Sequence, residues 1–484
     1  MKTLSIFILF FTTITMVGGC VKLEEVPEGS LSPENFYKTQ GDFEAAVTGL
    51  YAPLYGGYQG FDADPVMLLA GGAEDIGLIL WDAEYANFEQ LKPLPSSNMI
   101  FAVWNQFYLA INNANTLIKN VAGASGIAQE KLNEFEGQAR FIRAFSYFYV
   151  TRFWGKIPLV TELNNSKPDE VVESDELEVY KLIIEDLKIA EEKLDISYPV
   201  AGKATRGAAK TLLAKVYLTM GGWPIKDPTY FALARDKAKE VMDMNHYELA
   251  ADFADLWLVA NKLTNREAIF TMFGSSKYTW IEASHLHVET RPAVEAGWSS
   301  MFSEVRYFNS FPEGPRKDAT FHTVFNDGSS WENDVNKTPY IAKFRDAGAA
   351  AGPDTDAFSF DGDGVSLLIR YAETLLIYAE AANQAEGSPS ASALDAINAV
   401  RIRAGLTELP SGMSKDDFDK SVFDERGWEF AFEFGNRWFD LVRKEKVVEV
   451  NKDLYPYVDA HNMLVPKPAK ELDLVKGLKQ NPGY

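Results

Sequence analysis

The chain has 484 residues, 46% of them apolar and 13% aromatic, so it is long enough to bury a large core as one unit or two. Its formal net charge of -22 excludes nucleic acid and anionic membrane surfaces as main partners, because both would repel it. A neutral ligand is the easiest to reconcile with this charge.

The N-terminus reads as a lipoprotein signal peptide, residues 1–19. Lys2 precedes an apolar stretch from Leu4 to Val17, and Gly-Gly-Cys20 follows, which resembles a bacterial lipobox with Cys20 as the lipidated residue. Cys20 is the only cysteine, so no disulfide is expected. No later run approaches the ~18 apolar residues of a membrane span. We therefore expect a protein that is anchored to a membrane by lipid without crossing it.

Residues 20–30 form a polar tether, in which Glu24 and Glu25 resemble the acidic export signals of surface lipoproteins in Bacteroidetes. The remaining residues 31–484 are expected to form a single domain with helical parts at 31–246 and 365–484. Ser32-Pro33 predicts the start of the first helix. Apolar residues at spacings of three and four predict helices at 34–55, Ser97–Val121, Glu130–Phe153, Asp175–Leu194, Thr205–Met220, Thr229–Met244, Leu367–Gln384, Ser390–Ala404 and Ser414–Lys444.

Two regions lack this periodicity, Tyr51–Leu94 and the longer 247–364, and both are expected to be loops with short strands or turns. Binding residues concentrate in such loops. Helix pairs at Thr205–Val241 and Leu367–Ala404 have nearly the tetratricopeptide period. The predicted fold class is all-α (mainly α), with tetratricopeptide-like helical hairpins that support a loop-rich ligand-binding face.

Several sequence blocks in order after the lipobox resemble the SusD/RagB family of outer-membrane nutrient-binding lipoproteins from Bacteroidetes. They include FYKTQGDFEAAVTGLY, WNQFYLAINNANTLI, EGQARFIRAFSYFYVTRFWGKIPLV, GKATRGAAKTLLAKVYL, RYAETLLIYAEAANQ and DERGWEFAFEFGNRWFDLVR. The resemblance implies four tetratricopeptide-like hairpins under a loop-rich face. It also implies a cell-surface, outer-membrane protein that captures glycan and acts as the lid of a SusC-like TonB-dependent transporter.

This chain departs from the family pattern at two places. The late Glu-Gly-x-Arg motif is replaced by Glu433-Phe434-Gly435-Asn436-Arg437, and the usual Pro-Ile-Pro is Pro466-Lys467-Pro468. Both lie in scaffold segments, so they put local packing in doubt more than function.

A glycan site needs aromatic faces for the CH side of sugar rings and polar groups for the hydroxyls. The tryptophans Trp104, Trp154, Trp428 and Trp438 lie on predicted scaffold helices and are interpreted as core. The predicted glycan-binding residues are the loop aromatics Trp81, Tyr85, Trp280, Trp298 and Trp331, with Asp75, Asn98 and Arg306 as polar neighbours.

No metal or cofactor is expected. His285 and His287 alternate as on one side of a strand, but no third ligand follows at a suitable spacing. Ca²⁺ is kept as the alternative, because four carboxylates lie in a glycine-bearing loop that lacks the EF-hand order: Asp354, Asp356, Asp361 and Asp363. No phosphate-cradling glycine motif follows a strand.

Glu373 and Glu380 lie seven residues apart on a predicted helix, so both point the same way with a rise of ~10.5 Å between them. That spacing suits the acid and base of an inverting glycosidase. Structural pairing with Arg401, Arg403 and Arg426 is the favoured interpretation, because carboxylates in an apolar stripe need partners.

Three functions therefore remain open. A non-enzymatic binder of neutral oligosaccharide or polysaccharide is the first, an all-helical glycoside hydrolase is the second, and a repeat scaffold that binds only proteins is the third.

Overall fold

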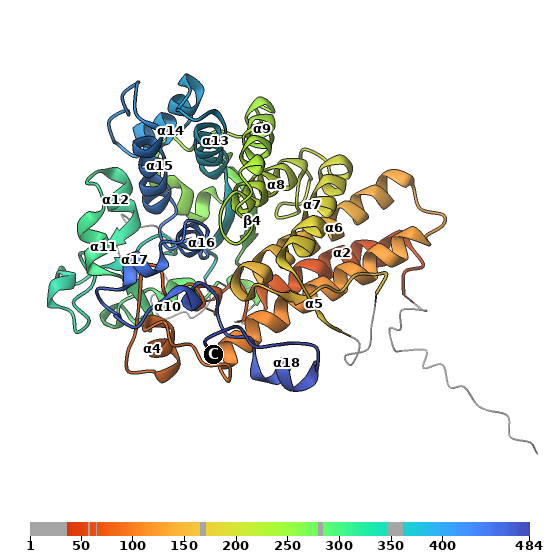
Figure 1. Cartoon of the computed structure of the whole chain (residues 1–484), viewed down its shortest axis with the longest axis horizontal. Coiled ribbons are helices and arrows are strands. Elements are labelled where there is room, and N and C mark those ends of the chain that lie inside the picture. Colours follow the sequence, from red (N-terminus) through yellow and green to blue (C-terminus); the bar gives the residue numbers. More distant parts are fainter. Residues whose placement is uncertain (1–35, 57–58, 64, 165–170, 279–283, 346–361) are drawn as a thin grey trace, which may run out of the picture.

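The structure is a computed structural model that describes residues 36–56, 59–63, 65–164, 171–278, 284–345 and 362–484. Long helices make up most of it, as the all-α prediction requires (Figure 1). They are α2 (Gln40–Tyr55), α5 (Asn98–Ala122), α6 (Gln129–Trp154), α7 (Glu176–Lys193), α8 (Arg206–Met220), α9 (Thr229–Asp243), α13 (Tyr371–Glu386), α14 (Ala391–Arg403), α15 (Lys415–Glu429) and α16 (Asn436–Arg443).

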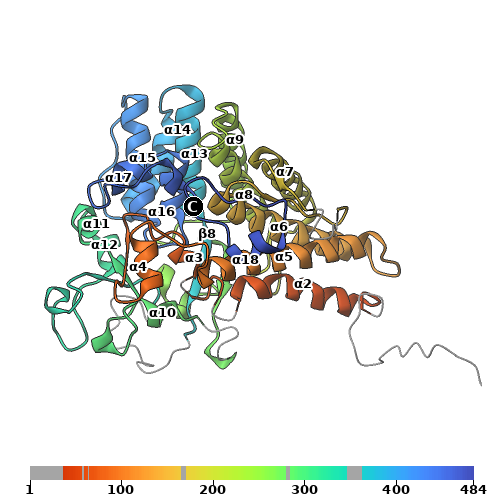
Figure 2. The ribbon, with the colours of Figure 1, turned by 60° about the horizontal axis from the view of Figure 1, so that its bottom comes forward.

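The long helices pack as neighbours in an antiparallel series, α2 on α5, α5 on α6, and so on to α9. The series skips the loop-rich segment and resumes where α13 packs on α9, followed by α14 and α15 (Figure 2). Several begin at side-chain caps, such as Thr205 for α8 and Ser390 for α14. Helical hairpins of the predicted tetratricopeptide type thus form the scaffold.

Shorter helices and strands lie mainly around the loop-rich face. The short helices are α3 (Pro65–Leu68), α4 (Ala83–Glu89), α10 (Leu286–Glu289), α11 (Val305–Ser310), α12 (Pro315–Thr320), α17 (Val447–Asn451) and α18 (Ala469–Leu474), and single 3₁₀ turns include η2 (Ala254–Trp257) and η6 (Trp331–Asn333). The strands form antiparallel pairs, namely β1 (Ile76–Leu78) with β5 (Met301–Ser303), β2 (Ile157–Pro158) with β3 (Glu173–Ser174), β4 (Ala268–Phe273) with β8 (Val365–Arg370), and β6 (Phe321–His322) with β7 (Tyr340–Ile341).

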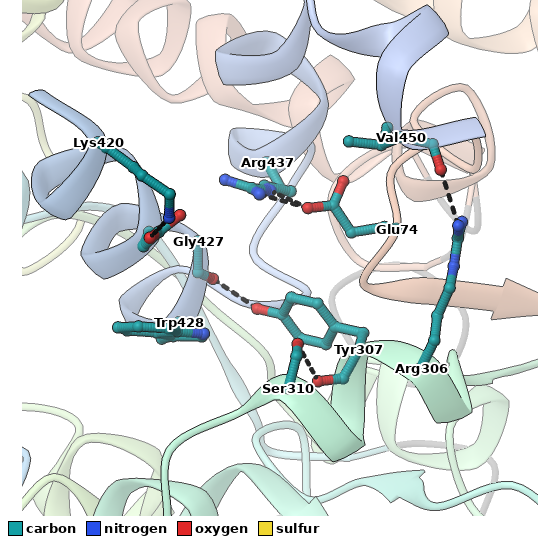
Figure 3. A pocket seen from close by; sticks show the side chains of 10 residues that line it. Glu74, Arg306, Tyr307, Ser310, Lys420, Gly427, Trp428, Arg437 and Val450 are labelled. Atoms are coloured by element: carbon teal, nitrogen blue, oxygen red, sulfur yellow. Dashed lines mark hydrogen bonds and ion pairs between the residues drawn. The ribbon is translucent and has the colours of Figure 1, made fainter. Parts of the chain in front are cut away.

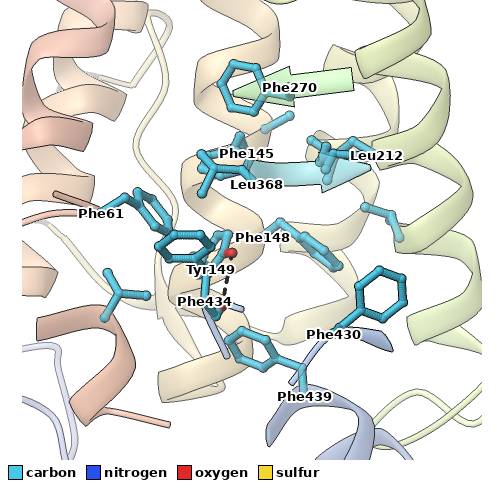
Figure 4. Close-up of a cluster of buried hydrophobic side chains, with 14 of the residues drawn as sticks. Phe61, Phe145, Phe148, Tyr149, Leu212, Phe270, Leu368, Phe430, Phe434 and Phe439 are labelled. Carbon is cyan, nitrogen blue, oxygen red and sulfur yellow. Dashed lines mark hydrogen bonds between the residues drawn. The ribbon is translucent and has the colours of Figure 1, made fainter. Parts of the chain in front are cut away.

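An aromatic core lies between α6, the β4–β8 pair and the chain after α15 (Figure 4). The Phe61 and Tyr149 rings meet edge to face with centroids 5.1 Å apart, and Phe145 packs in the same way on Phe270 of β4 at 5.4 Å. The Tyr149 hydroxyl donates to the carbonyl of Phe434 at 3.3 Å. The polar tip of a buried tyrosine thereby gains a partner, and the scaffold is tied to the C-terminal part of the chain.

The predicted helix Leu367–Gln384 begins too early. Residues 367–370 belong to the buried strand β8, and α13 starts at Tyr371. A short, continuous apolar run fits a buried strand as well as a buried helix, so periodicity did not distinguish the two. Pairing with β4 places residues 367–370 in a strand.

The predicted helix Ser414–Lys444 is in fact two helices, α15 and α16. Between them Phe432, Phe434 and Gly435 have φ values of 66°, 47° and 79°, in the left-handed region. This turn buries phenylalanine side chains in the core, and its conformation is fixed in part by the Asp75 carboxylate, which accepts a hydrogen bond from Phe432 N–H at 2.7 Å. Tertiary packing therefore overrides the helical pattern here.

The first long helix also starts later than predicted. Residues 36–39 are not helical, and α2 begins at Gln40, where Thr39 and Asp42 form a reciprocal capping box. The next region, 51–94, is less irregular than expected. It contains the last turn of α2 together with α3, β1 and α4.

Candidate functional site

One end of the β1–β5 pair carries two of the predicted tryptophans. The strands run antiparallel, with Leu78 opposite Met301. Trp81 lies three residues after Leu78, and Trp298 lies three residues before Met301. Both tryptophans therefore lie just beyond the same end of the pair, although 217 residues separate them in the sequence.

The two tryptophans differ in exposure. Trp81 is 81% exposed, and its neighbour Leu80 is 63% exposed. Trp298 is half-buried, and its backbone N–H donates to the carbonyl of Val288 at 2.8 Å, which holds its segment against α10. A large ring left in water contributes nothing to the core, so the Trp81 ring is available to stack on a ligand.

Helix α4 adds Tyr85 to this end of the strand pair. The Asp82 carboxylate caps the helix by accepting hydrogen bonds from the N–H groups of Glu84 and Tyr85 at 2.8 and 3.2 Å. The cap turns the chain directly after Trp81. Tyr85 consequently lies on the first helical turn, half-buried against the core.

Asn98 joins the same region through Glu84. The Glu84 carboxylate accepts hydrogen bonds from the Ser97 hydroxyl and from Met99 N–H, the latter at 3.2 Å, and so ties α4 to the first turn of α5. Asn98 is exposed there and lines a cavity of about 220 Å³ between the two helices, together with Glu84 and Asn87. Trp81 and Trp298 thus flank the same end of the β1–β5 pair, and Tyr85 and Asn98 follow on α4 and α5. We call these four residues the Trp81 site.

Asp75 and Arg306 lie at the opposite end of the β1–β5 pair. Asp75 is only 2% exposed and bonds Phe432 N–H, and burial raises its pKa to about 6. The predicted role of Asp75 as a polar neighbour of the ligand is therefore wrong for this structure, because the core encloses the carboxylate. Arg306 is exposed and donates to the carbonyl of Val450 at 2.7 Å.

The two other predicted tryptophans have different outcomes. Trp331 lies in η6, and its ring meets Phe308 of α11 edge to face at 5.8 Å between centroids. Trp280 lies outside the described residues.

Trp428 is not the core residue that the sequence predicted. Trp104, Trp154 and Trp438 are buried as expected, but Trp428 is partly exposed and lines a cavity of about 450 Å³ (Figure 3). The polar residue Asp424, four positions earlier, lies on the same face of α15. That spacing was the available signal that Trp428 is only partly buried.

Comparison with known proteins decides the family. The model of the SusD family matches residues 298–484, and a second model, described as starch-binding associating with outer membrane, matches residues 80–218. The SusD-like protein P2 of Formosa agariphila is 30% identical over 518 residues, which cover 99% of this chain and 99% of the relative. The chain belongs to the SusD family.

Solved SusD structures share its fold. A SusD superfamily protein from Bacteroides vulgatus has a TM-score of 0.80 at 22% identity, covering 93% of this chain and 100% of that chain. A laminarin-binding SusD-like protein has a TM-score of 0.77 at 25% identity, with the same coverage of 93% and 100%. The all-α fold with tetratricopeptide-like hairpins is thereby confirmed.

The two glutamates of α13 in this SusD-family chain lie in buried ion pairs. Glu373 faces Lys215 at 2.8 Å and Arg426 at 3.4 Å. Glu380 receives two hydrogen bonds from the Arg443 guanidinium, at 2.5 and 2.7 Å, and lies 2.9 Å from Lys444. Of the arginines expected as partners, only Arg426 contacts either glutamate.

Arg401 and Arg403 pair elsewhere. Arg401 lies 3.0 Å from Glu425, while Arg403 contacts Glu429 and lies 2.8 Å from Glu267. These contacts belong to a second buried ionic cluster, which joins α14 and α15 to the β4–β8 pair through Arg370. The pairing expected from sequence is therefore right for Arg426 and wrong for Arg401 and Arg403, because helix period fixes the face of a residue but not which neighbouring element meets it.

Glu380 is not set up as a glycosidase acid. Burial alone would raise the pKa of Glu380, but the positive charges of Arg443 and Lys444 lower it to about 2. A general acid needs a pKa near the working pH and access to a glycosidic oxygen. The position of Glu380 in the core offers neither.

No metal centre is assembled by the residues that the structure describes, where no group of three or more potential side-chain ligands comes together. His285 and His287 lie at the start of α10 and not on a strand, and His287 Nδ1 lies 3.0 Å from the carbonyl of Ser284 in the core. Of the acidic loop, Asp354, Asp356 and Asp361 lie outside the described residues. Asp363 accepts a hydrogen bond from Ser276 N–H at 2.9 Å.

The predicted signal peptide and Cys20 also lie outside the described residues. In the parts of the chain that are described, no helix combines the length and the apolar character needed to cross a bilayer.

Proposed function

We propose that this SusD-family chain is a non-enzymatic, surface-exposed lipoprotein that binds a neutral oligosaccharide or polysaccharide at the Trp81 site. The observation that carries the proposal is the 81% exposed Trp81 at the end of the β1–β5 pair. The half-buried Trp298 leaves from the same end, and Tyr85 and the Asn98 amide come from α4 and α5. Rings of this kind offer flat apolar area with few rotamers to freeze, and the amide offers both a donor and an acceptor for hydroxyls.

Two further facts support a glycan ligand. One of the matching family models is described as starch-binding, and a SusD-like neighbour at 25% identity binds laminarin. The net charge of -22 favours neutral polymers over anionic ones. We therefore expect a neutral glucan such as starch or a β-glucan.

The proposal includes a membrane anchor and a partner. Cys20 carries the lipid that holds the protein on the outer membrane, and a SusC-like TonB-dependent transporter receives the glycan under this chain as its lid. Support comes from the lipobox and from the family description, which names outer-membrane association. Replacing Cys20 by Ser should move the protein out of the membrane fraction. Tagged wild-type protein should co-purify with a TonB-dependent transporter from detergent-solubilised membranes, and recovery without one would refute the partnership.

Calorimetric titration of the purified protein with laminarin, starch-derived maltoheptaose and xyloglucan oligosaccharides tests glycan binding. For a glycan that binds, Trp81→Ala should lower affinity by at least about tenfold, because a central interface tryptophan commonly contributes about 2 kcal/mol. The melting temperature should stay unchanged, since Trp81 packs on little. Leu163→Ala is the matched control, as Leu163 is 89% exposed on another loop. Failure of the wild type to bind any glycan of a broad panel would refute the proposal.

A separate assay tests the proposal that the protein has no hydrolase activity. Prolonged incubation of concentrated protein with the bound glycan should release no new reducing ends. Sustained release that disappears on substitution of a carboxylate would instead establish the hydrolase alternative.

A further inference from the structure

We infer that the chain carries a second saccharide-binding subsite, in the cavity where Trp428 meets α11 and α17. The inference rests on the proposed function, because it assigns a further contact for the same class of ligand. The cavity has a volume of about 450 Å³ and is lined by Glu74, which precedes β1, and by residues from α11, α15, α16 and α17. We call it the Trp428 cavity (Figure 3).

The β1–β5 pair joins this cavity to the Trp81 site. Glu74 lies two residues before Ile76, and Arg306 lies three residues after Ser303, where these two strand residues face each other. Glu74 and Arg306 therefore flank the end of the pair opposite Trp81. Seven residues separate Trp81 from Glu74, and at about 3.3 Å per residue they span at most ~23 Å. One extended glycan chain has to cover only that distance to reach both places.

Trp428 supplies an aromatic platform whose position is fixed. The carbonyl of the preceding Gly427 accepts a hydrogen bond from the buried Tyr307 hydroxyl at 2.7 Å, which locks α15 against α11. The Trp428 ring is partly exposed into the cavity and otherwise packs on the core. Within the described residues, its indole N–H has no hydrogen-bond acceptor. A ring held in this way presents a flat apolar area and a free donor at no further entropic cost.

The charges around the platform largely cancel. Glu74 pairs with Arg437 at 2.9 Å, and Asp424 pairs with Lys420 at 2.5 Å. Arg306 forms no ion pair with a described residue. Its guanidinium donates one hydrogen bond to the carbonyl of Val450, and no described residue accepts from its other N–H groups.

Donors and acceptors are both left over in the cavity. Arg306 and the Trp428 N–H can only donate, and the second carboxylate oxygen of Asp424 can only accept. The Ser310 hydroxyl already donates to the carbonyl of Tyr307, so it is left to accept. An anionic group would satisfy Arg306 but would face the Asp424 carboxylate with a like charge. Hydroxyl groups donate and accept at once, and the CH face of a sugar ring suits the indole. These contacts select a neutral pyranose unit.

The test uses the glycan that binds wild-type protein among laminarin oligosaccharides, maltoheptaose and xyloglucan oligosaccharides. Hydrogen–deuterium exchange should show protection of the peptides that cover 305–310 and 424–430 on saturation. Arg306→Gln and Trp428→Ala should each lower the calorimetric affinity by about tenfold. Arg266→Gln, at another exposed arginine, is the matched control and should leave affinity unchanged.

Arg306 is exposed, so Arg306→Gln keeps the test valid if Trp428→Ala fails to fold. Unchanged affinity of Arg306→Gln, with no protection at either peptide, overturns the second subsite. If that result accompanies loss of binding in Trp81→Ala, only the second subsite is refuted and the proposed function stands. If the wild type binds none of the three glycans, both inferences are refuted for these ligands.

Discussion

Replacing Glu380 by glutamine should destabilise the protein in a pH-dependent way. Glu380 is buried, and the charges of Arg443 and Lys444 hold its pKa at about 2 instead of the ordinary 4.5. That difference corresponds to ~3 kcal/mol of stabilisation of the folded state. The folded pKa is lowered, so this stability is fully present above pH 4.5 and is lost as the pH falls through 2. At pH 3 only ~1 kcal/mol of it remains.

Urea denaturation of the wild type and of Glu380→Gln measures this contribution. The deficit of the variant in free energy of unfolding should be ~3 kcal/mol at pH 7 and about 1 kcal/mol at pH 3. Glu386→Gln is the control on the same helix, because Glu386 is at the surface, 3.2 Å from Arg235, and should cost less than ~0.5 kcal/mol. An equal deficit at both pH values would refute the electrostatic reasoning, and no deficit would refute the ion pair itself.

Two further substitutions probe the scaffold. Burial and, second, the nearby charge of Glu304 raise the pKa of Glu89 to about 8. Glu89 therefore ionises at lower pH in the unfolded chain than in the folded protein, and the wild type loses stability as the pH rises from about 4.5 to 8. The free energy of unfolding of Glu89→Gln should gain at least ~1 kcal/mol relative to that of the wild type between pH 5 and pH 8. Parallel pH profiles of the two unfolding free energies would contradict this. Gly435→Ala should cost ~1–2 kcal/mol, because φ is 79° and the added Cβ lies 3.2 Å from the Phe439 ring. Gly412→Ala, with φ of 82° and open space around it, should cost less, and the reverse order in urea denaturation would contradict the packing argument.

The scaffold was largely predictable from sequence because its helices bury one face each. Thr205–Met220 was predicted as a helix, and α8 spans Arg206–Met220 with Thr205 as its cap. The failures occur where a neighbour decides the conformation. Residues 367–370 are a strand because β4 pairs with them, and residues 430–435 leave the helix because their side chains enter the core. The residues that impose these two conformations are distant in the sequence, so no local pattern could predict them.

The site was predictable only in part, for a related reason. Trp81 was singled out as a loop aromatic, and it is exposed beside Tyr85. Asp75 has the same loop context but is buried by its bond to Phe432, more than 350 residues later. Trp428 was assigned to the core because it lies in a helix, although only one side of that helix faces inward. Loop or helix context therefore predicts less about exposure than the packing of each side chain.

The β4–β8 pair has a consequence for how ligand preference can diversify. Gly274 N–H bonds the carbonyl of Gly364 at 2.8 Å, so the long segment between them departs and returns at adjacent points of the scaffold. Its length and sequence can change without moving the helices that flank it, since loop-closure entropy grows only slowly with length. Several contacts nevertheless tie the segment to the scaffold. Arg316 inserts between Glu425 and Glu429, Lys343 pairs with Glu433, and β5 pairs with β1. An exchange of this segment between relatives would have to keep these contacts in order to transfer ligand preference.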